Sequence, residues 1–172
     1  MNEELSDPRR TEPPYVLATE RAMLEAWLEF HRTTLLLKCE GLVDHDRKAQ
    51  PVPTSILSLH GLVRHMAEVE RSWFRRVLLR EPDAPRIWPA LAKEGDFGSL
   101  EDADWEADLA AWQAECDCSR TAAADHQLED TGLRRGVPCS LHWIYVHMIE
   151  EYARHNGHAD LIREVVDGSV GW

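Results

Sequence analysis

Four residues near the end of the chain have side chains that bind metals or exchange protons, and they recur at helical spacing. In the segment HMIEEYARHNGHAD they are His147, Glu151, His155 and His158. Each residue of an α-helix advances about 100°, so all four fall within about 80° of one another. A Glu and a His four residues apart on one helix face can both reach a divalent ion such as zinc. The spacing therefore predicts part of a metal site.

The apolar residues of this segment indicate which of the four side chains point inward. With His147 at zero, they span about 60° to 160°. They are Leu141, Ile144, Tyr145, Met148, Tyr152 and Ile162. Glu151 and His155, at about 40° and 80°, lie at the edge of this face or inside it, whereas His147 and His158 lie further out. Because a buried carboxylate and imidazole are costly unless paired or bound to a metal, we predict Glu151 and His155 as ligands. We expect His147 and His158 to shape the pocket or orient the ligands.

One helix supplies only two ligands comfortably, so a third is expected from another segment. The segment SLHGLVRHMAEVERSWF contains His60 and His65. With His65 at zero, the apolar seam of this segment falls at about 40° to 120°, and His60 at about 220°. We therefore predict that His65 faces inward and that His60 does not. The alternative is that His65 is a hydrogen-bonded structural residue and that the Glu–His pair is a chance occurrence.

Four long helical segments are predicted to position these residues. Their apolar residues recur at steps of three and four, and Pro, Gly and Asp clusters separate them. They extend from about 18 to 40, 55 to 81, 99 to 128 and 140 to 166. Ser99 is the expected start of the third, and Ser140 and Gly168 are the expected caps of the fourth. Strand-like alternation appears nowhere for long, so the pattern predicts an all-α four-helix bundle.

The connecting segments are predicted to be loops. DHDRKAQPVP joins the first two helices, and EDTGLRRGVPC holds a turn or a short hairpin. The second loop, EPDAPRIWPALAKEGDFG, is long enough to be functional, so Trp88 is a candidate pocket residue. The acidic runs EDADWEAD and EVER are interpreted as solvated helix faces. The remaining histidines are interpreted as solvated or capping residues: His31, His45, His126 and His142.

Composition argues against several classes of partner. A length of 172 residues suits one domain, residues 1–172, with residues 1–17 as an extended arm. A net charge of −12 argues against nucleic-acid binding. The sequence contains no long apolar stretch and no basic amphipathic stretch, so no membrane partner is expected. The charged start is unlike a signal peptide, so we expect a cytoplasmic protein.

The cysteines lack paired C-x-x-C spacing and are interpreted as buried or half-buried thiols: Cys39, Cys116, Cys118 and Cys139.

Two of these segments resemble a known family. GLVRHMAEVERSWF and WIYVHMIEEYARHNGHADLIRE are similar to the signature helices of the DinB/YfiT-like superfamily, in particular its actinobacterial branch once labelled mini-circle proteins. The resemblance extends from about Glu20 to Val166. It implies a four-helix bundle in up-down-down-up order, often dimeric, with zinc or nickel held between the second and fourth helices. Many members use three histidines, but the related mycothiol-dependent maleylpyruvate isomerases use His, Glu and His. The resemblance thus implies His65, Glu151 and His155 as ligands.

The same resemblance leads to a functional expectation. Some members of the superfamily are thiol transferases for bacillithiol or mycothiol. Three protein ligands leave a tetrahedral ion with an open position, where a thiol is deprotonated or a water becomes a hydroxide source. We therefore expect a metal-dependent mycothiol S-transferase acting on small electrophiles.

Two alternatives stay open. One is a metal-dependent hydrolase, and the other is a non-catalytic dimeric bundle with a structural metal, for which a fourth ligand such as His147 or His158 would be the mark. The sequence does not choose among zinc, nickel, iron and manganese. A homodimer is expected because apolar residues such as Phe74 and Leu78 extend beyond one seam.

Overall fold

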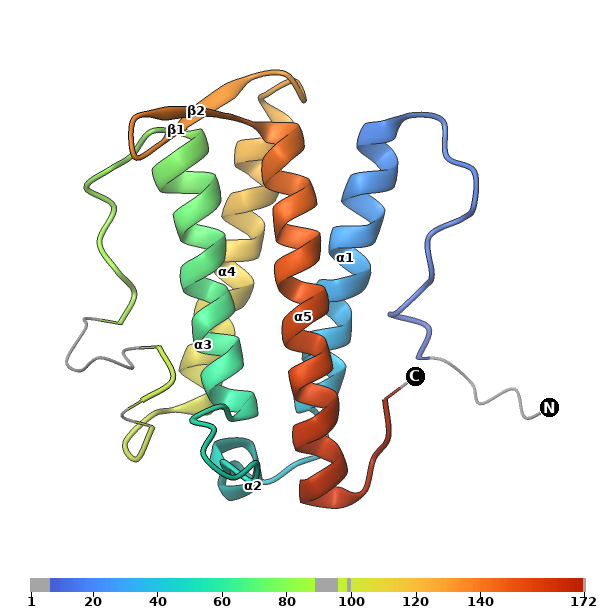
Figure 1. The fold of residues 1–172 in the computed structure, drawn as a ribbon, viewed down its shortest axis with the longest axis vertical. Helices are drawn as coiled ribbons and strands as arrows, with labels where there is room; N and C mark the ends of the chain where they lie inside the picture. The colour runs from blue at the N-terminus through green and yellow to red at the C-terminus, as the bar shows by residue number, and fades with distance from the viewer. Residues whose placement is uncertain (1–6, 89–95, 99, 172) are drawn as a thin grey trace.

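The computed structural model of the protein describes residues 7–88, 96–98 and 100–171. The chain is mostly helical, with one two-stranded sheet at one end (Figure 1). The elements are α1 (Glu20–Cys39), α2 (Asp44–Lys48), α3 (Leu59–Glu70), η1 (Arg71–Leu78), α4 (Trp105–Ala124), β1 (Thr131–Arg134), β2 (Val137–Ser140) and α5 (Leu141–Asp167). In Figure 1, α1 and α5 run downward, whereas α3 and α4 run upward.

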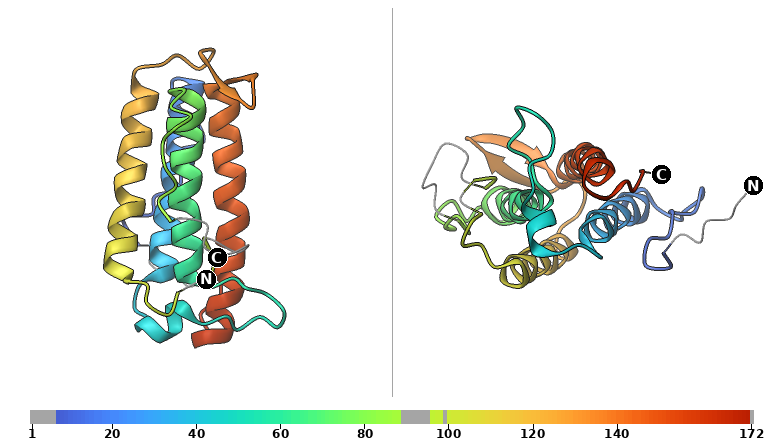
Figure 2. Two further views of the ribbon diagram at one scale, coloured as in Figure 1. Left: turned by 90° about the vertical axis from the view of Figure 1, so that its left-hand side faces the viewer. Right: turned by 90° about the horizontal axis from the view of Figure 1, so that it is seen from below.

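The long helices surround a common apolar core. Viewed from below, α1, α3, α4 and α5 enclose it, and α2 lies across the lower end (Figure 2). The largest fully buried apolar side chains come from α1, α3, η1 and α5: Leu28, Leu35, Leu59, Leu62, Met66, Phe74, Leu141, Ile144, Met148 and Ile162. Within the described ranges, no helix combines the length and the apolar character needed to cross a membrane.

Side-chain caps define where the helices begin. The predicted caps of α5 are confirmed: the Ser140 side chain accepts from the backbone N–H of Trp143, and Gly168 ends the helix with a left-handed φ of 80°. Asp104 caps α4, so this helix begins later than predicted, and Ser99 lies outside the described residues. Likewise α3 begins after Ser58 rather than at residue 55.

The predicted second helix changes its winding halfway. Its first part is the α-helix α3, and its second part, η1, is a π-helix. Periodicity does not reveal this change, because the apolar residues Trp73, Phe74, Val77 and Leu78 are compatible with either winding. All four are buried, with Phe74 1% and Leu78 3% exposed. The prediction that Phe74 and Leu78 extend beyond the core toward a dimer partner is therefore wrong.

Two short elements complete the fold. The segment expected to hold a turn or hairpin forms the antiparallel pair β1–β2, in which Gly132 is opposite Cys139. A Cβ atom at Gly132 would overlap the carbonyl oxygen of Val77, so the hairpin lies directly on η1. The first predicted loop contains α2, whose five residues are too few for a periodicity signal; an ion pair of 2.9 Å joins its Asp44 and Lys48.

A buried polar cluster joins the four long helices. Arg32 of α1 forms an ion pair of 2.7 Å with Glu70 of α3, and both are buried. The hydroxyl of Tyr152 donates to Glu70 at 2.8 Å and accepts from Trp112 Nε1 at 2.9 Å. We call Arg32, Glu70, Trp112 and Tyr152 the buried cluster. Because each residue lies on a different helix, the cluster ties the register of α5 to that of the other three.

Several polar residues are more buried than the sequence indicated. The interpretation of the acidic runs as solvated faces is wrong at Glu68, Glu70 and Asp108, which are buried and bound to cationic or aromatic partners. An acidic residue on a helix is buried when a neighbouring element offers it a counter-charge, which spacing alone does not show. The interpretation of the cysteines fails at Cys118, which is exposed; Cys39 and Cys116 are buried and Cys139 is half-buried.

Candidate metal centre

The three residues predicted as ligands come together between α3 and α5. One ligand atom from each of His65, Glu151 and His155 lies within 4.8 Å of the other two. Glu151 Oε1 is 3.5 Å from His65 Nε2 and 3.6 Å from His155 Nε2. Glu151 and His155 are buried and His65 is half-buried, so the group lies just beneath the surface.

The two separations from the carboxylate oxygen fit a small divalent ion. Nitrogen and oxygen ligands about 2.0–2.1 Å from a tetrahedral zinc are roughly 3.3 Å from one another. The separations of 3.5 and 3.6 Å are close to this value. They exceed the usual N–H···O hydrogen-bond range of about 2.7–3.2 Å. The three residues present therefore match a set of metal ligands better than a set of direct hydrogen bonds.

The outer nitrogens of both imidazoles also have partners. His65 Nδ1 lies 3.3 Å from Asp96 Oδ2, and Asp96 in turn pairs with Arg86 at 2.6 Å. His155 Nδ1 lies 3.3 Å from His158 Nδ1. These contacts leave both Nε2 atoms facing Glu151, as expected when a second layer of residues orients metal-binding histidines. Asp96 was not predicted, because a lone aspartate in a long loop has no periodic relation to the helices.

The surroundings keep the Glu151 carboxylate ionised. Contacts with His155 and His65 lower its pKa far below the ordinary value, and Arg154 contributes further. Arg154 pairs with Oε2, so Oε1 stays directed at the two imidazoles. For His65, burial lowers the pKa, but Asp96 and Glu151 outweigh it and the net shift is upward. The group thus has one fixed negative charge facing two imidazoles.

Phe97 covers the group from the loop side. Its ring stacks on His65 with centroids 4.7 Å apart and lies 6.5 Å from the His155 ring. A Cβ atom at Gly61 would come within 3.3 Å of the Phe97 ring, so a small residue there allows this close approach. Phe97 therefore shields one side of the group from water.

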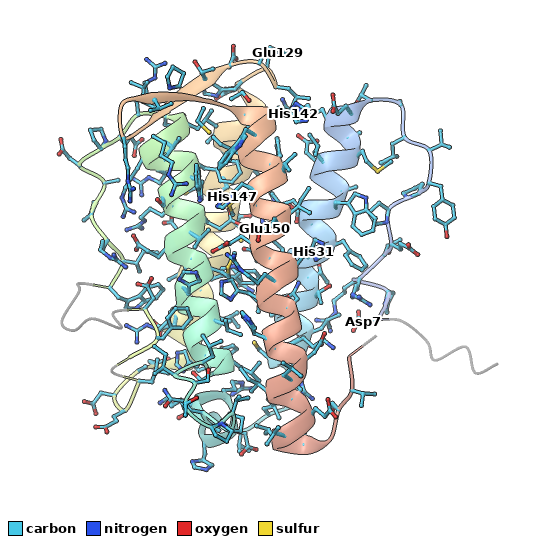
Figure 3. All side chains as sticks on the ribbon, in the orientation of Figure 1. Asp7, His31, Glu129, His142, His147 and Glu150 are labelled. Atoms are coloured by element: carbon cyan, nitrogen blue, oxygen red, sulfur yellow. The ribbon has the colours of Figure 1, made fainter. Side chains whose placement is uncertain are left out.

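His147 lies one helical turn above Glu151 and outside the ligand group. It projects from α5 near Glu150 (Figure 3), with 3.8 Å between His147 Nδ1 and Glu150 Oε2. Its ring stacks on Trp143 with centroids 5.0 Å apart and lies 4.5 Å from Trp73. Burial lowers its pKa, which favours the neutral form. These contacts place His147 in an aromatic wall next to the candidate metal centre.

The prediction that His60 faces away from the core is wrong. His60 is fully buried, and its Nε2 lies 2.8 Å from Asp108 Oδ2. The angular positions misled here because α3 packs on α4 as well as on α5, so two faces of α3 are buried. The candidate pocket residue Trp88 contacts this pair: its Nε1 donates to Asp108 Oδ1 at 3.1 Å, and Arg64 lies over its ring. These contacts of Trp88 are on the α4 side of α3, and not with the three predicted ligands.

The other histidines differ in their surroundings. His45 is exposed, and His126 lies 2.8 Å from the Ala122 carbonyl oxygen at the end of α4, so it is a capping residue. His142 is partly exposed and pairs with Glu20 at 3.2 Å. His31 is half-buried between aromatic rings of α1 and Asn156, so its interpretation as solvated or capping is wrong.

We expect the outer partners to tune metal affinity without setting the stoichiometry. The variants Asp96→Asn and His158→Ala should still bind one ion per chain, but with about 10–100-fold lower affinity, since each loses a group that orients an imidazole. The variant His147→Ala should leave affinity unchanged. Competition with a chromogenic chelator measures these constants. Loss of metal from His158→Ala as complete as from His155→Ala would show that His158 is itself a ligand.

Comparison with known proteins identifies the family. The family model described as mycothiol-S-transferase matches residues 23–168, which include α3, η1, α4 and α5 and all but the first three residues of α1. The comparison with individual curated proteins gives no significant match. The matched family is of the DinB/YfiT-like type, so the resemblance found in the sequence is confirmed. The chain belongs to the mycothiol S-transferase family of DinB/YfiT-like proteins.

Proposed function

We propose that the protein is a cytoplasmic, metal-dependent enzyme that transfers the sulfur of mycothiol to small electrophiles. The convergence of His65, Glu151 and His155 in a chain of this family is the observation that carries the proposal. The opposite directions of α1 and α5 against α3 and α4 support the up-down-down-up bundle of DinB-like proteins.

The proposed ligands are Nε2 of His65, Nε2 of His155 and Oε1 of Glu151. Two imidazoles and a carboxylate suit zinc, and nickel is the second choice. A divalent ion held there would stabilise the thiolate form of a low-molecular-weight thiol at neutral pH. Among the residues that the structure describes, no fourth His, Cys, Asp or Glu joins the group. This favours an enzyme over the alternative of a structural metal.

The residues around the ligands have distinct proposed roles. Asp96 and His158 orient the two imidazoles, and Phe97 excludes water from one side. His147 forms the wall along which a substrate approaches. In the transfer, a bond forms between the mycothiol sulfur and the electrophilic carbon, the leaving group departs with its bonding electrons, and the thiol proton passes to solvent.

The proposed transfer requires added thiol for turnover, whereas hydrolysis does not. We expect zinc- or nickel-loaded protein to convert 1-chloro-2,4-dinitrobenzene to its mycothiol conjugate above the uncatalysed rate. The chelated protein, or the loaded protein without mycothiol, should give only the background rate. Ester cleavage that is equally fast without thiol would contradict the transferase proposal and favour the hydrolase alternative. A failure to bind mycothiol in calorimetry would do the same.

We also propose that the protein is a homodimer, in line with the tendency of DinB-like proteins. Since Phe74 and Leu78 are buried within the chain, the contact must use other residues. Leu161 and Val165 are exposed apolar residues four apart on α5, and they are our candidates. Light scattering at micromolar concentration should give a dimer mass that Leu161→Glu reduces to a monomer mass. A monomer mass for the unmodified protein would contradict this proposal.

A further inference from the structure

The structure has a cavity next to the aromatic wall formed by Trp73, Trp143 and His147. It has a volume of about 500 Å³ and lies between the β1–β2 hairpin and the first turn of α5. Arg134, Arg135, Pro138 and Cys139 line it from the hairpin, and Trp143 lines it from α5. We call this cavity the hairpin pocket. Its lining combines two guanidinium groups with apolar and aromatic surface.

The two arginines of the hairpin pocket lack anionic partners. Neither the Arg134 side chain nor the Arg135 side chain forms an ion pair or a hydrogen bond with any residue that the structure describes, and the Arg134 guanidinium instead lies over the Trp73 ring at 4.0 Å. This is unusual in a chain with 31 acidic residues and a net charge of −12. Two unpaired cations beside an apolar cavity favour a ligand with a negative charge.

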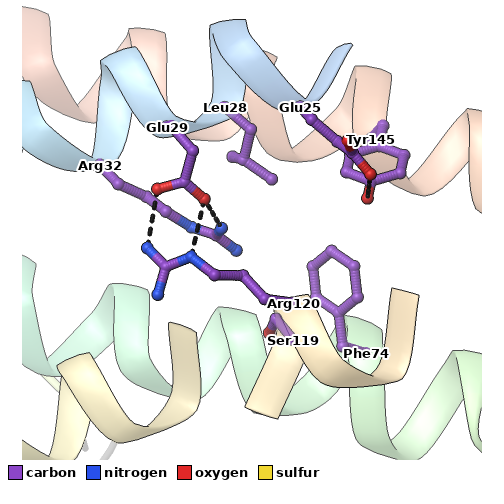
Figure 4. A pocket seen from close by; sticks show the side chains of 8 residues that line it. All are labelled: Glu25, Leu28, Glu29, Arg32, Phe74, Ser119, Arg120 and Tyr145. Atoms are coloured by element: carbon purple, nitrogen blue, oxygen red, sulfur yellow. Dashed lines mark hydrogen bonds and ion pairs between the residues drawn. The ribbon is translucent and has the colours of Figure 1, made fainter. Parts of the chain in front are cut away.

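Another cavity, of about 300 Å³, provides a contrast. It lies between α1 and α4 and also has two arginines, Arg32 and Arg120 (Figure 4). There Glu29 lies between the two guanidinium groups and pairs with both, at 2.6 and 2.7 Å. Its cations are therefore already neutralised. Of the two cavities, only the hairpin pocket presents guanidinium groups without a carboxylate of the chain.

The hairpin pocket and the candidate metal centre lie along the same helix, α5. Trp143, His147, Glu151 and His155 follow one another at steps of four, so they form one stripe. On the facing element, His65, Val69 and Trp73 have the same spacing, and Trp73 lies 5.1 Å from Trp143. The eight residues from Trp143 to Glu151 correspond to about 12 Å along the helix. A ligand of that length can reach from the pocket to the metal centre.

These observations point to the second substrate rather than to the thiol. Mycothiol has no anionic group at neutral pH, because its thiol stays largely protonated until a metal binds it, so the guanidinium groups do not match it. We propose that the hairpin pocket binds the carboxylate of an anionic aromatic electrophile, with Arg134 and Arg135 pairing with the carboxylate and Trp143 packing on the ring. The proposal rests on the proposed function, and it names the substrate class of that enzyme.

Binding can be tested apart from catalysis with an unreactive probe. Biphenyl-4-carboxylate should bind the metal-loaded protein at least about 10-fold more tightly than biphenyl-4-carboxamide, since only the acid forms charge-assisted hydrogen bonds. In a Cys118→Ser background, the acid should also slow the alkylation of Cys139, the half-buried thiol of the pocket. The variants Arg134→Gln and Arg135→Gln should lose the preference for the acid, whereas Arg9→Gln, an exposed arginine on the N-terminal segment, should keep it. Equal affinity for acid and amide, or alkylation of Cys139 that the acid does not slow, would overturn the proposal.

Turnover tests the same preference with a reactive pair. With 4′-(chloromethyl)biphenyl-4-carboxylate, the mycothiol sulfur forms a bond to the benzylic carbon, chloride departs with the bonding electrons, and the thiol proton goes to solvent. We expect kcat/KM for this acid to exceed that of its carboxamide by about 10–100-fold, and the difference to vanish in Arg134→Gln. If the probe binds as described but no thiol is transferred, carboxylate binding by the hairpin pocket is supported and the proposed transferase function is rejected. If both compounds react equally fast with mycothiol, the proposed function stands and the anionic substrate class fails.

Discussion

Glu151→Ala is expected to lose the proposed metal and with it the proposed transfer of mycothiol. The variant removes one of the three proposed ligand atoms, a carboxylate oxygen that lies 3.5 and 3.6 Å from the two imidazoles. The loss of affinity should therefore exceed the roughly 10–100-fold effect of losing an outer partner. Metal content by elemental analysis and the mycothiol-dependent rate should fall together. The helical circular-dichroism signal should persist, because Glu151 lies at the edge of the core.

The chain offers a matched control for this experiment at the neighbouring position. Glu150 is exposed, is not one of the three predicted ligands and pairs with Arg154, so Glu150→Ala should keep both metal and activity. His155→Ala should behave as Glu151→Ala does. Full metal content in Glu151→Ala would show that the carboxylate is only a hydrogen-bond partner of the histidines.

Glu70→Ala is expected to be the most destabilising single substitution among the ion pairs. Glu70 is 0% exposed and its partner Arg32 is 4% exposed. Burial opposes the charge of Arg32, but Glu70 outweighs it, and the pKa of Arg32 stays well above its usual range. Removal of the carboxylate leaves Tyr152 without its acceptor and the buried Arg32 guanidinium with only the partly exposed Glu29 as an ion-pair partner among the described residues. This should cost about 3–5 kcal/mol of unfolding free energy. Urea denaturation measures this cost.

Two further variants show whether burial of the pair causes the effect. Arg120→Ala breaks an exposed pair with Glu29 and should cost less than about 1 kcal/mol. In the double variant Arg32→Met and Glu70→Met, neither charge of the buried cluster remains, so it should be more stable than Glu70→Ala. A double variant less stable than Glu70→Ala would mean that the charges of the buried cluster themselves stabilise the fold.

The helices that the sequence predicted well are those with their own capping residues. Ser140 and Gly168 fix the ends of α5, and Thr19 caps α1, so local hydrogen bonds decide these boundaries. The winding of η1 and the docking of the hairpin against Val77 were not predictable. Both depend on contacts between residues far apart in the sequence, to which helical periodicity is insensitive.

The sequence by itself determined which residues of α5 share a face. The four-residue step from Glu151 to His155 and their position beside the apolar residues follow from helix geometry, and both are buried as expected. The family resemblance rested on the same segment. These properties are local, so the order of residues is sufficient to state them.

Only the tertiary structure decided what surrounds that face. His60 and His65 both point into the protein, because α3 is covered by α4 on one side and by α5 on the other, so the choice of His65 depends on which helix lies opposite. Asp96 and Phe97 reach His65 from a loop whose sequence gives no sign of its path. The buried cluster fixes the register between α3 and α5, and a shift of one turn, about 5.4 Å, would separate the three ligand atoms. The ligand types are thus a matter of sequence, whereas their convergence depends on long-range packing.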